Sequence, residues 1–314
     1  MKRKKKNNFD TKKLQVIILS VLLVANGIAT SILLKNVKIP WVDEAIYVSM
    51  GKYIFSRGEY GYMDVFRAFG LPLLSGIAWL IGISPLIFLK YLSIFSWFFS
   101  AIVLYEIERK ILKTGNMISL ISFLFFLGFS IYYTRALTDS ISMFFGLLGF
   151  YFLLRKDFFS SGFFFGFSGL IRYTGLTYFL VAIVAYFVNE ILHKKQFHLK
   201  TFLKNVGVFT LMFSVMFLPN LLLSKAYFGS YLYMILSTFK NRYEQMWYGD
   251  ANLLTHLGFV FLTPLAFSVF LILKKEMFNE QYSLAFIFVF ILSLLFFSSP
   301  IMTKEKRYFM FVLP

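Results

Sequence analysis

The feature that most constrains this chain is a series of long apolar runs separated by short charged segments. Residues 14–34 contain no charged residue, and residues 85–107 contain two. A helix needs about 20 apolar residues to cross the hydrocarbon core of a bilayer, and both runs reach that length. Composition agrees, because 59% of the residues are hydrophobic, 21% are aromatic and only 15% are charged, which is far from the balance of a soluble domain. The sequence therefore predicts an all-α polytopic membrane protein.

The charges are distributed as expected for a chain inserted in a membrane. The formal net charge is +17, and the lysines cluster at the ends of the apolar runs, as the positive-inside rule predicts. Residues 1–13 form a basic tail, which we place in the cytoplasm against anionic membrane lipid. Nucleic acid is not an expected partner, although the same charge would suggest it in a soluble domain. The chain has no cysteine, which excludes disulfides and thiolate metal sites.

The order of apolar and polar segments predicts the topology. The run at 14–34 is longer than the apolar core of a signal peptide, about 7–15 residues, so we expect a retained span. Residues 14–314 then form one multi-span domain with outer loops at 35–84 and 224–252. Residues 71–81 are too short to cross and are expected to form a helix near the outer surface. Further spans are expected at 85–107, 117–133, 140–154, 201–223, 253–273 and 282–297, with two more in 158–191 that break near Arg172.

This arrangement has two further consequences. The N-terminus and residues 108–115 and 193–200 lie in the cytoplasm, and the inner segments carry the larger excess of basic residues. An apolar run that stops at Pro314 suggests that a C-terminal part is missing.

Ionisable residues collect at the outer face in this topology. Asp43 and Glu44 follow the first span directly, and Arg135, Asp139 and Arg172 are expected at the same level. Ionisable groups near membrane depth are costly and usually face a cavity or a partner. One alternative is that the acidic pair is merely solvated or caps the following helix. For Arg172, the alternative is a side chain that extends to the outer headgroups. Convergence of all these groups at one face favours a functional site.

Six short motifs occur in order along the chain. They are Asp43-Glu44-Ala45 with Tyr47, the segment from Arg67 to Pro72-Leu73, Arg135-Ala136-Leu137-Thr138-Asp139, the glycine-rich 166–175 with Arg172-Tyr173, Pro219-Asn220, and Arg307-Tyr308. The series resembles the GT-C class of membrane glycosyltransferases, in particular the group of dolichyl-phosphate-mannose-protein mannosyltransferases and aminoarabinose (lipid A) transferases. The chain departs from that group at Ala68-Phe69-Gly70, where many relatives have prolines.

The resemblance implies a fold and a reaction. The fold is a GT-C type helical bundle with a long first outer loop that carries the acidic motif and short juxtamembrane helices. The reaction is transfer of a sugar from a polyprenyl-phosphate donor to an acceptor hydroxyl on a protein, lipid or glycan, with inversion at the anomeric carbon. Asp43 is the first candidate for the base that takes the acceptor proton. Glu44 is the second candidate, or the group that orients the acceptor.

The leaving lipid phosphate needs fixed cations, and Arg172 is the best candidate because guanidinium holds phosphate with two hydrogen bonds. Tyr173 belongs to the same expected substrate site. Asp139 is expected to orient Arg135 or to hydrogen-bond the sugar. The weaker cation candidates are Arg67, Lys90, Lys306 and Arg307. A divalent metal held by Asp43 and Asp139 is a less favoured alternative, since hard cations need several oxygen ligands.

Two other functions remain open on the sequence alone. A polytopic transporter or a flippase for a lipid-linked sugar would use charges near the middle of the membrane and often has two related halves. A non-catalytic partner subunit in cell-surface assembly would need no catalytic groups. The collection of charges at one face, without an evident internal repeat, favours the enzyme.

Overall fold

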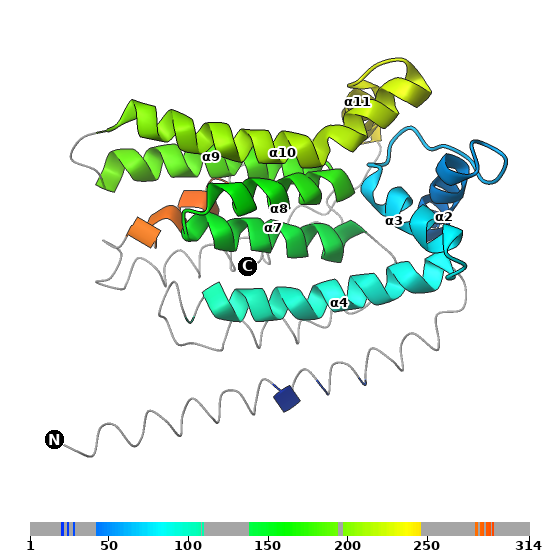
Figure 1. Ribbon diagram of the computed structural model, residues 1–314, viewed down its shortest axis with the longest axis horizontal. Helices are drawn as coiled ribbons and strands as arrows, with labels where there is room; N and C mark the ends of the chain where they lie inside the picture. Colours follow the sequence, from blue (N-terminus) through cyan, green and yellow to red (C-terminus); the bar gives the residue numbers. More distant parts are fainter. Residues whose placement is uncertain are drawn as a thin grey trace.

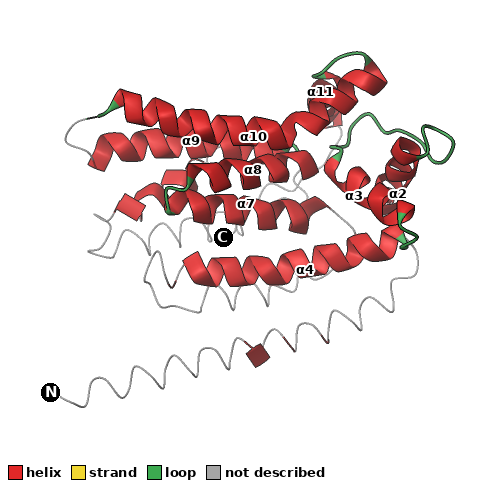
Figure 2. Cartoon of the chain, viewed as in Figure 1, coloured by secondary structure: helices red, strands yellow, loops and turns green. Residues whose placement is uncertain are grey.

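The computed structural model describes residues 42–107, 109, 138–193 and 197–245, together with single positions within 20–28 and 280–291. This part of the chain is helical and contains no strand (Figure 2). Its helices are α2 (Val42–Phe55), α3 (Gly70–Leu80), α4 (Pro85–Glu106), α7 (Thr138–Leu154), α8 (Phe158–Ile171), α9 (Thr174–His193), α10 (Leu199–Phe228) and α11 (Tyr233–Gln245).

Three of these helices are long and apolar enough to cross a membrane. They are α4, α9 and α10, with 22, 20 and 30 residues. The helices α3, α7 and α8 are apolar but shorter. With 14 residues, α8 is about 21 Å long, less than the ~30 Å of a bilayer core. The helical class predicted from the sequence is confirmed for the described residues, and their candidate spans agree with membrane association.

Two predicted boundaries are confirmed. The run at 158–191 forms two helices, because α8 ends at Ile171 and α9 begins at Thr174, with Arg172 in an extended conformation between them. The short helix expected at 71–81 is α3, and Pro85 starts α4 in the first helical turn, where its missing N–H costs nothing.

The segment 224–252, expected to be a polar outer loop, is helical over most of its described residues. Helix α10 continues to Phe228 and ends at Gly229, whose left-handed φ of 77° is a common helix stop. Helix α11 follows after a short turn, in which the Ser224 hydroxyl donates to the Ser230 carbonyl and accepts from the Met234 N–H. The polarity of this segment does not indicate its helices, and these hydrogen bonds stabilise the turn between them.

Several expected segments lie outside the described residues. They are the basic tail, the spans at 117–133 and 253–273, most of the first span, and the basic segment that contains Lys306 and Arg307.

Helix α8 lies between α7 and α10 and packs against α9 as well (Figure 1). Small residues allow this close packing, as is typical of helix pairs in membranes. A Cβ added at Gly162 or Gly166 would meet the backbone of α10 at 2.2 or 2.6 Å. On the α7 side, the hydroxyls of Ser142 and Ser168 are 2.9 Å apart.

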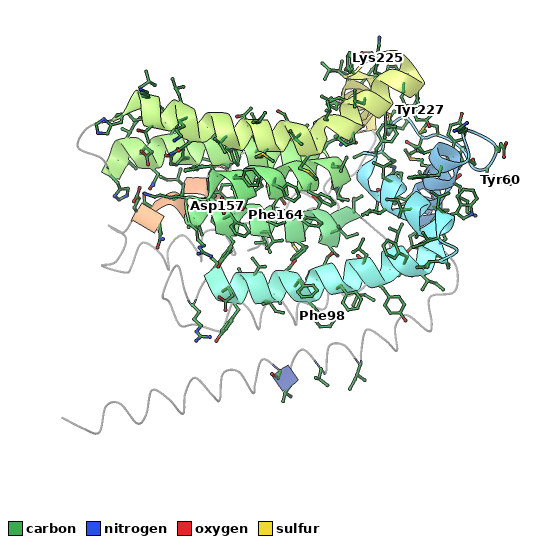
Figure 3. All side chains as sticks on the ribbon, viewed as in Figure 1. Tyr60, Phe98, Asp157, Phe164, Lys225 and Tyr227 are labelled. Atoms are coloured by element: carbon green, nitrogen blue, oxygen red, sulfur yellow. The ribbon has the colours of Figure 1, made fainter. Side chains whose placement is uncertain are left out.

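The described helices divide into a stack and an end group. Helices α4, α7, α8, α9 and α10 lie side by side, and α2, α3 and α11 gather at one end of them, on the right in Figure 1. Lys225 and Tyr227 lie toward this end, and Asp157 lies toward the other (Figure 3). Helix α7 begins and α8 ends near the end group. The acidic and basic residues at these termini are thereby brought beside α2.

Candidate functional site

The first ion pair of the site joins α2 to the loop that follows it. Asp43 lies in the first turn of α2, and its Oδ1 accepts a hydrogen bond from Arg67 Nη2 at 2.7 Å. The side chains of Arg67 and Asp43 are 28% and 18% exposed. Asp43 is therefore held by a cation but remains within reach of solvent.

The second ion pair joins the start of α7 to the residue after α8. Arg172 Nη1 lies 2.5 Å from Asp139 Oδ1 and 3.2 Å from the hydroxyl of Thr138. These side chains are almost buried, at 11% exposed for Arg172 and 2% for Asp139. The sequence suggested instead that Asp139 orients Arg135 or hydrogen-bonds the sugar. The pairing differs because the antiparallel packing of α7 and α8 brings residue 139 against residue 172, while Arg135 lies outside the described residues.

Tyr47 connects the two ion pairs. It lies one turn after Asp43 on α2, and the Arg67 guanidinium carbon is 5.7 Å from the centre of its ring. Its hydroxyl lies near Arg67 and the side chain of Thr138. Burial raises the pKa of Tyr47, Arg67 and Arg172 oppose this shift, and Asp43 adds to it. Tyr47 is therefore a neutral phenol between two guanidinium groups.

Arg67 itself sits on a loop that α11 holds in place. The Ser237 hydroxyl donates to the Val65 carbonyl at 2.8 Å, and the Thr238 hydroxyl donates to the Phe66 carbonyl at 2.9 Å. Both hydroxyls also lie within hydrogen-bond distance of the Met234 carbonyl in their own helix. This contact could not be predicted from the sequence, because nothing local in 224–252 indicates which backbone carbonyls its hydroxyls reach.

Asn220 holds the other side of the same loop. Its Oδ1 accepts from the Phe69 N–H at 2.8 Å, and its Nδ2 donates to the carbonyls of Gly169 and Leu170 at 3.2 and 3.3 Å. The side chain is on α10, and the residue is 2% exposed. Pro219-Asn220 stood out as a motif in the sequence, but only the fold shows which segments Asn220 joins.

Glu44 and Lys90 are buried at the same end. Glu44 is 0% exposed and Lys90, near the start of α4, is 8% exposed. The alternative of a simply solvated acidic pair is therefore wrong for Glu44. Both acidic residues of α2 lie in its first turn, where the helix dipole favours negative charge.

Tyr173 follows Arg172 and packs against Phe217, with 6.4 Å between the ring centres. Its hydroxyl and that of Thr174 are buried and have no hydrogen-bond partner among the described residues. Such groups are costly to leave unsatisfied, so this turn has two hydroxyls that could hydrogen-bond a bound molecule. Lys306 and Arg307 lie outside the described residues.

The acidic residues of the described ranges do not form a donor set for a metal ion. Within the described ranges, no group of three or more histidine, cysteine, aspartate or glutamate side chains could hold one. Asp43 and Asp139 each make an ion pair with an arginine instead. A hard cation takes about six oxygen ligands, so the metal alternative has no support in the described residues.

Comparison with known proteins does not identify a family for this chain. No protein-family model, no curated protein and no solved structure matches the chain.

Proposed function

We propose that this protein is a membrane glycosyltransferase of the GT-C type. It transfers a sugar from a polyprenyl-phosphate donor to an acceptor hydroxyl, with inversion at the anomeric carbon. The observation that carries the proposal is the pair of aspartate–arginine ion pairs joined through Tyr47 at one end of a group of apolar helices. Sugar transfer from a lipid phosphate requires this combination of a carboxylate and a fixed cation at a membrane face.

Asp43 acts as the base in this proposal. The acceptor oxygen attacks the anomeric carbon from the face opposite the phosphate, and its proton passes to the Asp43 carboxylate. The bond between the anomeric carbon and the phosphate oxygen breaks, and polyprenyl phosphate leaves with the bonding electrons. The Arg67 contact at 2.7 Å orients the carboxylate for this step. General-base catalysis contributes about 10²–10⁴-fold in rate.

Arg172 receives the charge that develops on the leaving phosphate. Asp139 and Thr138 engage its Nη1 group and so fix the orientation of the guanidinium. A guanidinium in a fixed orientation can hold a phosphate with two parallel hydrogen bonds. Arg67 and Lys90 add positive charge at the same end, with Lys306 and Arg307 as further candidates. Glu44 orients the acceptor, and Tyr173 hydrogen-bonds the donor.

In this account the protein is a multi-pass protein of the cell membrane with a cytoplasmic N-terminus and an outer active site. The acceptor is a protein, a lipid or a glycan. The transporter and flippase alternatives are less favoured, because one ion pair joins the start of α7 to the end of α8 and the other lies at the start of α2, so neither lies along a central path.

Turnover by the purified protein tests the proposal. Protein in lipid nanodiscs is incubated with polyprenyl-phosphate sugars and with acceptor extracts from the source cells. The proposal expects release of polyprenyl phosphate in step with the appearance of glycosylated acceptor. A flippase would move the donor between leaflets of a vesicle and leave the sugar–phosphate bond intact. Mass analysis of surface glycans after deletion of the gene would then identify the sugar.

A further inference from the structure

The two arginines of the site lie on chain segments that one buried side chain joins. Asn220 hydrogen-bonds Phe69, two residues after Arg67, and it hydrogen-bonds Gly169 and Leu170, which precede Arg172 by three and two residues. These contacts connect positions 151, 51 and 50 residues away from Asn220 in the sequence. We propose that Asn220 is a positioning residue, which sets the separation between the Asp43–Arg67 pair and the Asp139–Arg172 pair. This inference rests on the proposed function.

The chemistry of an amide suits this task. The last carbonyls of a helix have no partner within the helix, and the two N–H groups of Asn220 match two such carbonyls at the end of α8. The carbonyl oxygen of the same side chain accepts from the loop. An apolar side chain of similar size would leave one buried N–H and two buried carbonyls without these bonds, and unsatisfied buried groups are costly.

A glycine beside this contact supports the same conclusion. A Cβ added at Gly70 would lie 2.6 Å from the Leu170 carbonyl oxygen, so the loop and the end of α8 approach as closely as backbones can. The close approach places Phe69 N–H where Asn220 can reach it. Small-residue contact and amide hydrogen bonds thus act together on the distance between the two segments.

The separation matters because the base and the phosphate ligand are on different segments. In the proposed reaction Asp43 and Arg67 act on the acceptor side, and Arg172 acts on the leaving group. A displacement of about 1 Å between groups that act on one substrate can cost about 10²-fold in rate. Loss of Asn220 should therefore lower kcat about 10²-fold, while donor KM, which depends on Arg172 and its own partner, changes little.

The experiment combines a distance measurement with kinetics. The chain has no cysteine, so spin labels can be placed at Phe66→Cys and Leu180→Cys, which are exposed positions on the loop and on α9. Asn220→Ala is compared with Asn189→Ala, since Asn189 is an equally buried asparagine of α9. We expect the label-to-label distance distribution to widen or shift in Asn220→Ala and to stay unchanged in Asn189→Ala.

Asn220→Gln provides a second variant in case Asn220→Ala does not fold. It keeps the amide donors and the acceptor but places them one methylene farther along the side chain, so its distances and kcat should lie between those of the wild-type protein and Asn220→Ala. An unchanged distance distribution in both Asn220 variants, or an unchanged kcat, overturns the inference. If the labels respond but the wild-type protein transfers no sugar, the proposed function is overturned and the role of Asn220 in spacing the segments stands.

Discussion

Arg172 is the residue at which two interpretations of the site differ most clearly. In one it binds the donor phosphate, and in the other it extends to the lipid headgroups. Its guanidinium contacts Asp139 and is 11% exposed, so it is not simply extended toward lipid headgroups. Removing one partner of such a pair leaves an uncompensated charge and costs about 3–5 kcal/mol. A substitution that keeps the charge is therefore the more informative test.

We predict that Arg172→Lys folds normally but loses donor binding and turnover together. Lysine can pair with Asp139 as a point charge, but it cannot hold a phosphate with the two parallel bonds of a guanidinium. Donor affinity and rate are measured in nanodiscs, with Arg155→Lys as the control, because Arg155 is an exposed arginine after α7. Unchanged donor affinity in Arg172→Lys would move the search for the phosphate site to Lys306 and Arg307.

Tyr47 allows a second test with a small change. Tyr47→Phe keeps the ring beside Arg67 and removes the hydroxyl that contacts Arg67 and Thr138. A typical hydrogen bond contributes about 1 kcal/mol, so we expect the free energy of unfolding to fall by about 1–2 kcal/mol and turnover to fall several-fold. Tyr60→Phe, at an exposed position, should change neither. Equal turnover in both variants would remove Tyr47 from the site.

The raised pKa of Tyr47 predicts a pH effect on stability. Burial is the main cause of the shift, and the unfolded value is about 10. A raised native pKa gives a contribution to stability that is fully present below pH ~10 and is lost as pH rises through the native pKa. The stability of the wild-type protein should therefore fall more steeply above pH ~10 than that of Tyr47→Phe. Superimposable denaturation curves from pH 8 to 11 would contradict this assignment.

At the scale of elements, the position of Arg172 depends on how α8 packs. A Cβ at Gly162 would lie 2.2 Å from the Phe209 carbonyl oxygen, whereas one at Gly207 meets nothing within 4 Å. We predict that Gly162→Ala lowers the free energy of unfolding by about 1–3 kcal/mol, as overpacking does. Gly207→Ala should be neutral or slightly stabilising, since alanine favours helix over glycine. Thermal unfolding in detergent compares the two, and equal melting temperatures would contradict the packing of α8 on α10.

The elements also show where sequence reasoning succeeds and where it fails. The break at Arg172 was predictable, because a glycine-rich apolar segment that reaches a charged residue rarely continues as one helix. The helical character of 233–245 was not predictable from polarity. The Asp139–Arg172 pair was not predictable either, since it depends on the packing of α7 against α8. Asn220 stood out in a motif, yet its partners come from two distant segments that only the fold brings together.

At the scale of the whole molecule, the prediction concerns which end faces outward. The end group of α2, α3 and α11 should be accessible from outside the cell, and the opposite end should face the cytoplasm. Tyr60→Cys and Lys200→Cys introduce single thiols at exposed positions of the two ends. An impermeant thiol reagent on intact cells should label the first and spare the second until the cells are opened. Labelling of position 200 in intact cells would reverse the topology.

The central claim is that Asp43 is the base of a sugar transfer from a lipid phosphate. The measurement that tests it most directly is turnover of a polyprenyl-phosphate sugar by purified Asp43→Asn and wild-type protein at equal donor occupancy. The account predicts a loss of about 10²–10⁴-fold in rate, with donor binding and melting temperature close to those of the wild type. Glu44→Gln should keep residual activity, because an orienting group contributes less than the proton acceptor. Turnover at the wild-type rate by folded Asp43→Asn would contradict the account.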